Sequence, residues 1–571
     1  MTDVADAETA DADPFQRALA EHMAGNFLHA KQQYRAILKS DPNHFDTHQM
    51  LGVLLAQNGD PKEGITHLLR ALELDSKSPA AYNNYGNVLR LLERSDEALA
   101  AYEKALQIDP DYREAGANFG GLLYELSRYE EAIAFWSKEI LICQDSGLAH
   151  NSLAMSLIEV GRYEEALIHC EMAISLMPDF FPAYGNAAVA LVMLNQYDEA
   201  IARCEEALSI NPDYPEAHHN AAIAFEKSNL SEKALASYAA AHSLVPNDLQ
   251  ILFNQSLLHL RLGNYTQGFK DHELRWEIKK LREKIPMIDS PRPASLEAVR
   301  GKRILLCGEQ GIGDVLQFIR YAQPLTKIAA EVHAVMPRSV VSLFGDALSL
   351  SSVSAYGEIL PAVDYFTSLM SLPHLFGTTL QTIPAKVPYI LADPQKISEW
   401  KRRIGSHEKI TVGLAWSGNP KHVNDRNRSI ALSALQPIIS LPGFTFISLQ
   451  QEMRPEDAVV AARADKLLQF GEHLKDFSDT AALAACVDLI ISVDTSVAHL
   501  AGAMALPLWV LLPFSPDWRW LENRDDSPWY PTAKLFRQGK VGDWGGVIDR
   551  VVNDLLRFQR KKSWIRRIFS T

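Results

Sequence analysis

The chain has 571 residues, more than one hydrophobic core usually supports, so we expect roughly two to four domains. Its 47% hydrophobic and 22% charged residues are ordinary for a folded, water-soluble protein. The formal net charge of -14 argues against general nucleic-acid binding, because such binding needs a clustered basic face.

The cysteines and the N-terminal residues indicate in which cellular compartment the protein is found. The five cysteines are odd in number, lie far apart and form no CxxC pair, which favours neither a disulfide framework nor a zinc site. Residues 1–10 are acidic and are expected to be disordered, without the basic and apolar regions of a signal peptide. The longest apolar stretch, Leu500–Phe514, is shorter than the ~20 residues that span a bilayer. We therefore expect a cytoplasmic protein.

A period of 34 residues runs through residues 11–282. Its eight frames begin at Asp11, Phe45, Pro79, Arg113, Gly147, Phe181, Pro215 and Leu249. Positions 8 and 20 of every frame hold alanine, glycine or serine, because two antiparallel helices cross closely only where neither carries a bulky side chain. Proline occupies position 32 in five frames and ends the second helix, since it lacks an N–H donor. This tetratricopeptide pattern predicts an α solenoid of eight repeats with a concave surface for another polypeptide.

A column of asparagines recurs on the first helices of the repeats. Position 6 of the frames holds Asn84, Asn118, Asn186, Asn220 and Asn254, with Ser152 interrupting the column. An amide both donates and accepts, so this column is suited to hold an extended acceptor chain without reading its sequence. A similar ladder lines the repeat groove of the O-GlcNAc transferases. The alternative is packing between repeats, since asparagine is common at this position in tetratricopeptide repeats.

The pattern changes after residue 282. Residues 283–300 are proline-rich and read as a linker, and short apolar segments then alternate with helical segments. The strand candidates are Arg303–Cys307, Glu331–Val335, Ile410–Leu414, Thr445–Leu449, Leu489–Val493 and Leu506–Leu512. Near-continuous apolar runs are typical of parallel strands, and helices between them predict doubly wound α/β sheets. We predict two Rossmann-like domains, over residues 301–393 and 394–556, followed by a basic tail over 557–571.

A glycine-rich loop, Gly308–Asp314, follows the first predicted strand and precedes a predicted helix over Val315–Tyr321. Glycines permit a sharp turn that leaves amides exposed at a helix N-terminus, where anionic or polar ligands bind. Gln310, Gly311 and Gly313 would form this loop, and Asp314 would project into the cleft. The segment is neither GxGxxG nor a P-loop, and Asp314 alternatively caps its helix.

Two further loops carry polar groups. Asp494, Thr495 and Ser496 follow the strand Leu489–Val493 and open a helix that also carries His499. Short polar groups and free amides at a helix start suit a diphosphate, although a lone histidine such as His499 is usually structural. The other loop, Trp416–Lys421, is followed by Asp425–Ser429. Its cations would neutralise charge on a leaving nucleotide, with Arg428 the stronger candidate and Lys421 alternatively part of a solvated basic loop.

On these residues, Lys302–Asp554 resembles glycosyltransferases of the GT-B fold, specifically the family 9, heptosyltransferase-like group. The most specific segments are GxGDVLQFIRY at Gly311–Tyr321 and DTSVAHLAGAMALPLWVLLP at Asp494–Pro513. The resemblance implies Asp314 as the catalytic base. It implies Asp494, Thr495, Ser496 and His499 as ligands of the donor nucleotide-diphosphate, with Arg428 or Lys421 as the basic phosphate ligand.

The sequence also departs from that family. Ser496 stands where the family commonly has glycine, which puts an ADP-heptose donor in doubt. Trp518–Trp520 and Trp529–Pro531 resemble instead a bacterial subgroup that joins repeats to such a domain. Some of that subgroup modify proteins, flagellin among them, and the O-GlcNAc transferases share the architecture.

These resemblances imply an inverting glycosyltransferase that moves a sugar from a nucleotide-sugar to a hydroxyl of a protein held by the repeats. No DxD-type carboxylate pair is present, so neither a metal nor another cofactor is expected. One alternative is a non-catalytic repeat scaffold with a degenerate GT-B module. Another is a lipopolysaccharide glycosyltransferase whose basic tail, with cations around Trp564 and Ile565, contacts anionic lipid rather than being solvated.

Overall fold

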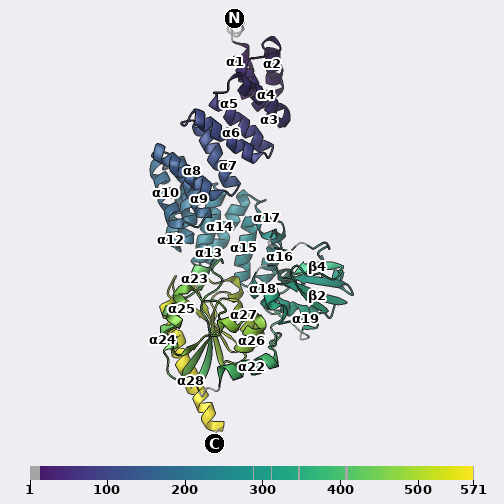
Figure 1. Cartoon of the computed structure of the whole chain (residues 1–571), viewed down its shortest axis with the longest axis vertical. Coiled ribbons are helices and arrows are strands. Elements are labelled where there is room, and N and C mark those ends of the chain that lie inside the picture. The colour runs from purple at the N-terminus through teal and green to yellow at the C-terminus, as the bar shows by residue number, and fades with distance from the viewer. Residues whose placement is uncertain are drawn as a thin grey trace. The chain divides into compact units, whose positions relative to one another are not determined.

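The computed structural model describes residues 13–283, 285–286, 288–309, 311–344, 348–405, 409–422 and 424–569, with side chains to residue 562. The predicted disordered segment over residues 1–10 lies outside these residues. The chain forms two compact units, one ending at Pro212 and one beginning at Asp213. Helices build the first unit, and the second combines helices with parallel sheets (Figure 1).

The first unit is a tetratricopeptide solenoid of paired helices. They are α1 (Pro14–Met23), α2 (Phe27–Ser40), α3 (Phe45–Gln57), α4 (Pro61–Leu74), α5 (Pro79–Leu91), α6 (Ser95–Ile108), α7 (Arg113–Glu125), α8 (Tyr129–Ile142), α9 (Gly147–Glu159), α10 (Tyr163–Leu176), α11 (Phe181–Met193) and α12 (Tyr197–Ile210). A Cβ added to Gly120 would lie 2.3 Å from the Trp136 ring, and one added to Gly86 would lie 2.5 Å from the Tyr102 ring. The helices therefore cross at the small residues that the sequence pattern picks out, and the predicted repeat fold is confirmed.

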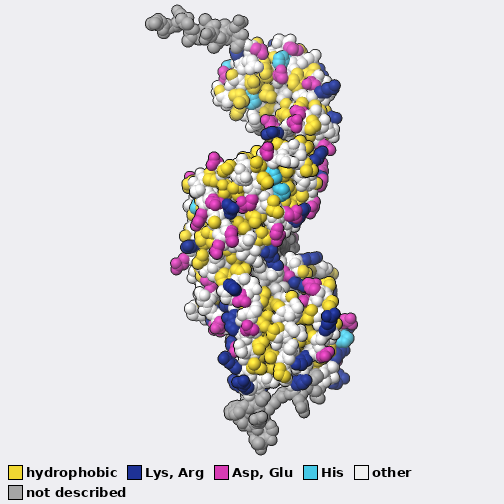
Figure 2. All heavy atoms as spheres, turned by 90° about the vertical axis from the view of Figure 1, so that its left-hand side faces the viewer, with side chains coloured by type: hydrophobic (Ala, Val, Ile, Leu, Met, Phe, Trp, Pro, Cys, Tyr) yellow, Lys and Arg dark blue, Asp and Glu magenta, His cyan; other side chains and the backbone are white. Residues whose placement is uncertain are grey.

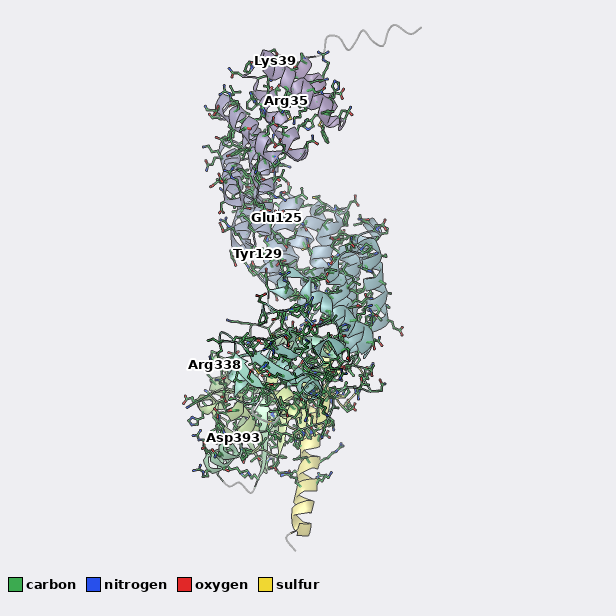
Figure 3. All side chains as sticks on the ribbon, turned by 90° about the vertical axis from the view of Figure 1, so that its right-hand side faces the viewer. Arg35, Lys39, Glu125, Tyr129, Arg338 and Asp393 are labelled. Carbon is green, nitrogen blue, oxygen red and sulfur yellow. The ribbon has the colours of Figure 1, made fainter. Side chains whose placement is uncertain are left out.

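Exposed ion pairs connect neighbouring repeats of this unit. Arg35 on α2 pairs with Glu63 on α4, and Arg90 on α5 pairs with Glu125 on α7 at 2.7 Å (Figure 3 labels Arg35 and Glu125). On the face shown in Figure 2, acidic and basic side chains are interspersed. Exposed pairs contribute only about 0–1 kcal/mol each, so the buried apolar contacts between helices supply most of the stability.

A histidine pair occurs in two repeats of the first unit. The Nδ1 atoms of His48 and His67 are 3.0 Å apart, and those of His150 and His169 are 2.9 Å apart. His48 Nε2 lies 3.0 Å from the backbone oxygen of Pro42, which assigns the proton of the neutral ring to Nε2. Its Nδ1 is then an acceptor for Nδ1–H of His67. Burial, followed by the partner histidine, lowers the pKa of both His67 and His169.

We expect these pairs to make the first unit less stable in acid. Because the folded pKa values of His67 and His169 lie below the unfolded value of about 6.5, the unfolded state binds more protons once the pH falls below that value. Native-state hydrogen exchange of α4 and α10 should show stability declining from pH 7 to pH 5, by less than ~1.4 kcal/mol per pH unit for each histidine. The double variant His67→Gln/His169→Gln should lose less than the parent over this interval, and an equal loss would exclude the pairs as the cause.

The second unit begins with four more repeat helices, α13 (Pro215–Lys227), α14 (Ser231–Leu244), α15 (Leu249–Arg261) and α16 (Tyr265–His272). Next come η1 (Glu273–Trp276), α17 (Lys279–Arg282), η2 (Glu297–Val299), α18 (Ile312–Phe318), η3 (Ile319–Tyr321), α19 (Ala322–Leu325), α20 (Arg338–Val341), η5 (Leu369–Ser371), α21 (Leu372–Leu375) and α22 (Pro394–Ile404). The remaining helices are α23 (Asp425–Arg428), η6 (Leu432–Leu435), α24 (Gln436–Ile439), α25 (Pro455–Ala461), η7 (Gly471–His473), α26 (Phe477–Ala484), α27 (Ser496–Ala503), η8 (Trp518–Trp520) and α28 (Trp544–Phe569). The segment predicted as a basic tail thus continues α28 as far as Phe569.

Two parallel sheets lie among these helices. The first has the order β3-β2-β1-β4 and contains β1 (Arg303–Cys307), β2 (Glu331–Met336), β3 (Ser352–Ala355) and β4 (Tyr365–Ser368). The second has the order β10-β9-β8-β5-β6-β7 and contains β5 (Ile410–Ala415), β6 (Phe444–Ser448), β7 (Leu467–Leu468), β8 (Leu489–Val493), β9 (Leu508–Leu512) and β10 (Ala533–Arg537). The predicted α/β class is therefore confirmed. The order reverses between β1 and β4 and between β5 and β8, and ligands of open α/β sheets bind at the carboxyl ends of such strands.

The last repeat, formed by α15 and α16, shares a hydrophobic core with the sheets. Tyr265 and Phe269 of α16 are buried in one cluster with Phe318, Trp518 and Trp529. The Nε1–H group of Trp529 donates to Tyr265 Oη at 2.9 Å. This repeat is therefore a structural part of the second unit, which also contains α13 and α14. Among the described residues, no helix combines the length and apolarity that crossing a membrane requires.

Candidate functional site

The loops after β5 and β8 meet at the switch point of the second sheet. Arg428 donates through Nη1 to the backbone oxygen of Asp494 at 3.1 Å. A Cβ added to Gly418 would lie 2.7 Å from Arg428 Nη2, so this glycine lets the guanidinium lie against its loop. Arg428 Nε is buried and has no hydrogen-bond partner among the described residues. The structure thus brings Arg428 and Asp494 together, while Asp425 Oδ1 lies 3.8 Å from Arg428 Nε.

The N-terminus of α27 lies beside this arginine. The helix begins at Ser496, directly after Thr495, and Asp494, Thr495 and His499 are buried. Thr495 Oγ1 lies 3.1 Å from Ser492 Oγ at the end of β8. A helix N-terminus carries N–H groups without helical partners and a partial positive charge, which together suit an anion such as a diphosphate.

Asp314 lies in the first turn of α18. The expected helix start at Val315 is wrong because α18 begins at Ile312, and Asp314 Oδ2 accepts the Gly311 N–H at 2.9 Å. This bond is the capping role that the sequence left open. The other carboxylate oxygen accepts a hydrogen bond from Arg519 Nη2 and forms an ion pair with it. Asp314 therefore both caps its helix and faces the second sheet's loops.

Arg519 is the centre of a charge cluster. Its Nη1 donates to Asp517 Oδ1 at 2.8 Å, and its guanidinium lies 4.5 Å from the centre of the Trp518 ring. Burial raises the pKa of Asp314, although Arg519 opposes this effect. Burial, followed by the charge of Asp517, raises the pKa of Asp494 to about 6. Two carboxyl groups with raised pKa values and a buried arginine therefore share one site, as is common where proton transfer occurs.

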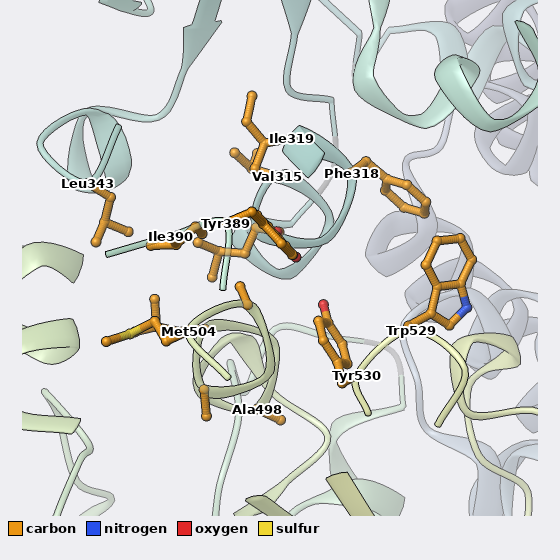
Figure 4. Close-up of a cluster of buried hydrophobic side chains, with 14 of the residues drawn as sticks. Val315, Phe318, Ile319, Leu343, Tyr389, Ile390, Ala498, Met504, Trp529 and Tyr530 are labelled. Carbon is orange, nitrogen blue, oxygen red and sulfur yellow. The ribbon is translucent and has the colours of Figure 1, made fainter. Parts of the chain in front are cut away.

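Helices α18 and α27 pack directly on each other and join the two sheets (Figure 4). A Cβ added to Gly313 would lie 2.8 Å from His499 Cδ2, so glycine permits this close approach. His499 Nδ1 lies 2.9 Å from Tyr530 Oη, and the histidine ring stacks on Trp520 at 5.5 Å. Burial, followed by Arg519, lowers the pKa of His499 to about 3, so the ring is neutral at pH 7. These contacts give His499 a packing role at the boundary between the sheets.

The remaining predicted site residues that the structure describes do not lie in the buried cluster around Arg428, Asp494 and Arg519. Gln310 lies outside the described residues, and Gly311 is exposed at the start of α18. The Lys421 side chain is exposed, and its backbone amide donates to Asn419 Oδ1 at 3.0 Å. Arg519 and Asp517 also belong to this site and were not predicted from the sequence. The sequence feature that could have indicated them is the Trp518–Trp520 segment, in which an arginine stands between two large aromatic residues.

The asparagine column forms contacts between adjacent repeats. All five asparagines are half-buried, with Asn84, Asn118 and Asn186 in the first unit and Asn220 and Asn254 in the second. Asn118 Nδ2 donates to Asn83 Oδ1, and Asn186 Nδ2 donates to Asn151 Oδ1, each at 2.8 Å. Each of these bonds uses one amide hydrogen and leaves other capacity on the side chain. Packing between repeats is thus one role of the column, and its role in holding a polypeptide stays a prediction.

Comparison with known proteins supports the repeats. Tetratricopeptide-repeat family models match residues 15–79 and 50–113, and a second set matches residues 157–224 and 191–252. Protein FlbA of Caulobacter vibrioides is 26% identical over 347 residues, which cover 55% of this chain and 56% of that protein. The chain thus spans about half the length of this relative.

Solved structures are similar over parts of the chain. YrrB, whose structure is described as that of a TPR protein with an unusual peptide-binding site, is 23% identical, with a TM-score of 0.28. It is matched over 33% of this chain and 96% of its own. PilF of Pseudomonas aeruginosa is 20% identical, with a TM-score of 0.32, over 37% of this chain and 96% of its own. On its sequence matches and its fold, the chain contains tetratricopeptide repeats, is similar over about half its length to protein FlbA, and continues into an α/β region.

Proposed function

We propose that the second unit is a GT-B glycosyltransferase that moves a sugar from a nucleotide-sugar to a hydroxyl of a protein held by the repeats. The observation that carries this proposal is the packing of α18 on α27 at the contact between Gly313 and His499. This contact sets Asp314, a candidate base, near the N-terminus of α27, a candidate diphosphate seat. Repeats of this class generally bind other proteins, which supports a protein acceptor, and flagellin is one candidate by resemblance.

The proposed reaction needs a base on one side of the sugar and a cation on the other. The acceptor oxygen attacks the anomeric carbon, and its proton passes to Asp314. The bond between that carbon and the diphosphate oxygen breaks, and its electron pair leaves with the nucleoside diphosphate. Arg428 and the N-terminus of α27 stabilise the departing negative charge. Attack opposite the leaving group inverts the configuration at the sugar.

One observation favours a second candidate. Asp314 is already engaged by Arg519 and by the Gly311 amide, so in this arrangement its carboxylate is not available to an acceptor hydroxyl. A repeat scaffold with a non-catalytic module would keep such an ion pair permanently. An enzyme would have to release Asp314 from Arg519 when the donor and acceptor bind.

Replacing Asp314 with asparagine distinguishes the two candidates. We expect transfer from a radiolabelled panel of nucleotide-sugars to fall at least ~100-fold, because the base is lost, while binding of the matching nucleoside diphosphate is unchanged. Asp364→Asn is the control, because Asp364 pairs with Arg303 and is partly exposed. Full turnover by Asp314→Asn would exclude this residue as the base. Wild-type protein that binds no nucleotide would support the scaffold.

A further inference from the structure

A buried arginine from the end of the repeats reaches the first sheet. Arg275 lies in η1, directly after the last repeat helix, and is 1% exposed. Its Nη2 donates to Glu309 Oε1 at 2.8 Å and its Nε to Glu309 Oε2 at 3.0 Å. The Glu309 side chain is also 1% exposed. Such two-point pairing fixes orientation as well as distance, which a lysine at this position would not do.

Glu309 belongs to the glycine-rich loop that leads to Asp314. It follows β1 by two residues and precedes Asp314 by five. Ser368 at the end of β4 donates its hydroxyl to Glu309, and Ser371 Oγ accepts from Arg275 Nη2 at 2.7 Å. Arg275 therefore contacts the carboxyl ends of β1 and β4, the switch point at which open α/β sheets usually bind ligands.

The repeats hold the opposite loop as well. Arg261 at the end of α15 is 2% exposed, and its Nη1 donates to Ser515 Oγ at 2.9 Å. Its Nε lies 2.9 Å from Glu522 Oε1, and Asn229 Nδ2 donates to the Phe514 backbone oxygen at 3.0 Å. These contacts bracket the segment that carries Arg519, the partner of Asp314. The last two repeats thus hold both sides of the Asp314–Arg519 ion pair.

We propose that Arg275 is a positioning residue for the site: it holds Glu309, and through Glu309 it sets the conformation of the loop that presents Asp314. Hydrogen bonds with Val335 and Tyr356 hold Gly308, and the Asp314 carboxylate holds Gly311. The Arg275–Glu309 pair adds a side-chain anchor next to Gly308. The end of the repeat array is then part of the transfer site. The effect on activity rests on the proposed function, whereas the effect on the loop does not.

The first test measures the loop itself in the full-length protein. In Arg275→Gln, amide hydrogen exchange of the peptide over residues 308–318 should rise about tenfold or more, because Glu309 loses its anchor. The matched control is Tyr265→Phe, which removes the hydroxyl that accepts from Trp529 at the same boundary and leaves Glu309 untouched. This control should not change exchange over residues 308–318. Unchanged exchange in Arg275→Gln would overturn the proposal.

A second variant guards against unfolding caused by an unpaired buried charge. Arg275→Gln/Glu309→Gln removes both charges of the buried pair and leaves Glu273, a partly exposed second partner of Arg275. Such double replacements often retain the fold where the single change does not. It should show the same faster exchange over residues 308–318. Protection as strong as in the wild type would overturn the proposal.

The third readout is catalytic. With an active donor and acceptor, Arg275→Gln should lower kcat by about 100-fold with nucleoside diphosphate affinity unchanged, because misplacement of the base affects the reacting geometry. Arg275→Lys should recover part of kcat. A change in nucleotide affinity alone would contradict positioning of Asp314. If the wild type transfers no sugar, the proposed function fails, while the exchange experiment still decides the role of Arg275.

Discussion

Replacing Arg519 with glutamine is expected to destabilise the second unit by roughly 3–5 kcal/mol, because it leaves neighbouring carboxylates without their cation. Asp314 and Asp517 both bind the guanidinium directly, and Asp494 is influenced by it. The loss should be larger at pH 8 than at pH 5, since Asp494, with a pKa of about 6, is mostly neutral at pH 5. The raised pKa of Asp314 acts in the same direction. Hydrogen exchange of α18 and α27 at both pH values measures this effect.

Two variants control that experiment. Arg519→Lys keeps the charge but loses the fork that binds two carboxylates, so it should be intermediate in stability. Arg519→Gln/Asp314→Asn should be less destabilised than the sum of the single variants, with a coupling of about 0.5–3 kcal/mol. Additive losses would show that the ion pair contributes nothing of its own.

The same replacement should also move the pH profile of transfer. Arg519 lowers the pKa of Asp314 against the effect of burial, so its loss raises that pKa further. A base must be deprotonated to accept a proton. The acid limb of kcat/KM should therefore shift to higher pH in Arg519→Gln. If the acid limb of kcat/KM does not shift, it reflects the titration of a group other than Asp314.

Replacing Trp529 with alanine is expected to cost roughly 3–5 kcal/mol, as for other fully buried large aromatic residues. Trp529 is 0% exposed and donates a hydrogen bond to Tyr265 on the last repeat. The guanidinium carbon of Arg320 lies 5.3 Å from the centre of the Trp529 ring. The loss should be seen in hydrogen exchange of both α16 and α18, because this ring joins the repeats to the first sheet's helices. Local exchange is the suitable measurement, since a chain with two units need not unfold in one step.

Matched changes separate the contributions of the ring. Trp529→Phe keeps an aromatic ring but removes the N–H donor to Tyr265, so it should cost less than alanine. Trp509→Ala removes a half-buried ring from β9 that packs on Phe536 and should leave α16 unaffected. Equal losses in α16 from Trp509→Ala and Trp529→Ala would contradict the specific joining role of Trp529.

The repeats and the apolar strands were predictable because their physics is local. Small residues every 34 positions follow from close helix crossing, and the bounds predicted for β1 and β8 agree with the structure. Four strands were missed. Strands β3 and β4 have four residues each with several polar side chains, β7 has two residues, and β10 is an edge strand with cations, so none gives an apolar run.

The candidate site was predictable only where its residues share a loop. Asp494, Thr495 and Ser496 are consecutive, and alternation of strands and helices places them at a carboxyl end of the sheet. Arg519 contacts Asp314 across 205 positions of sequence, and Arg275 contacts Glu309 across 34. These pairings depend on how α18, η8 and the last repeat pack together, and no local pattern in the sequence encodes them.

The boundary after Pro212 separates repeats that can change in number during evolution from repeats that cannot. Repeats before it belong to the first unit, whereas Arg261, Tyr265 and Arg275 are buried in the second unit. Gain, loss or exchange of whole repeats upstream would alter which polypeptides the array can bind. Recombination between relatives would have to carry the last two repeats together with the α/β region, as one inherited piece.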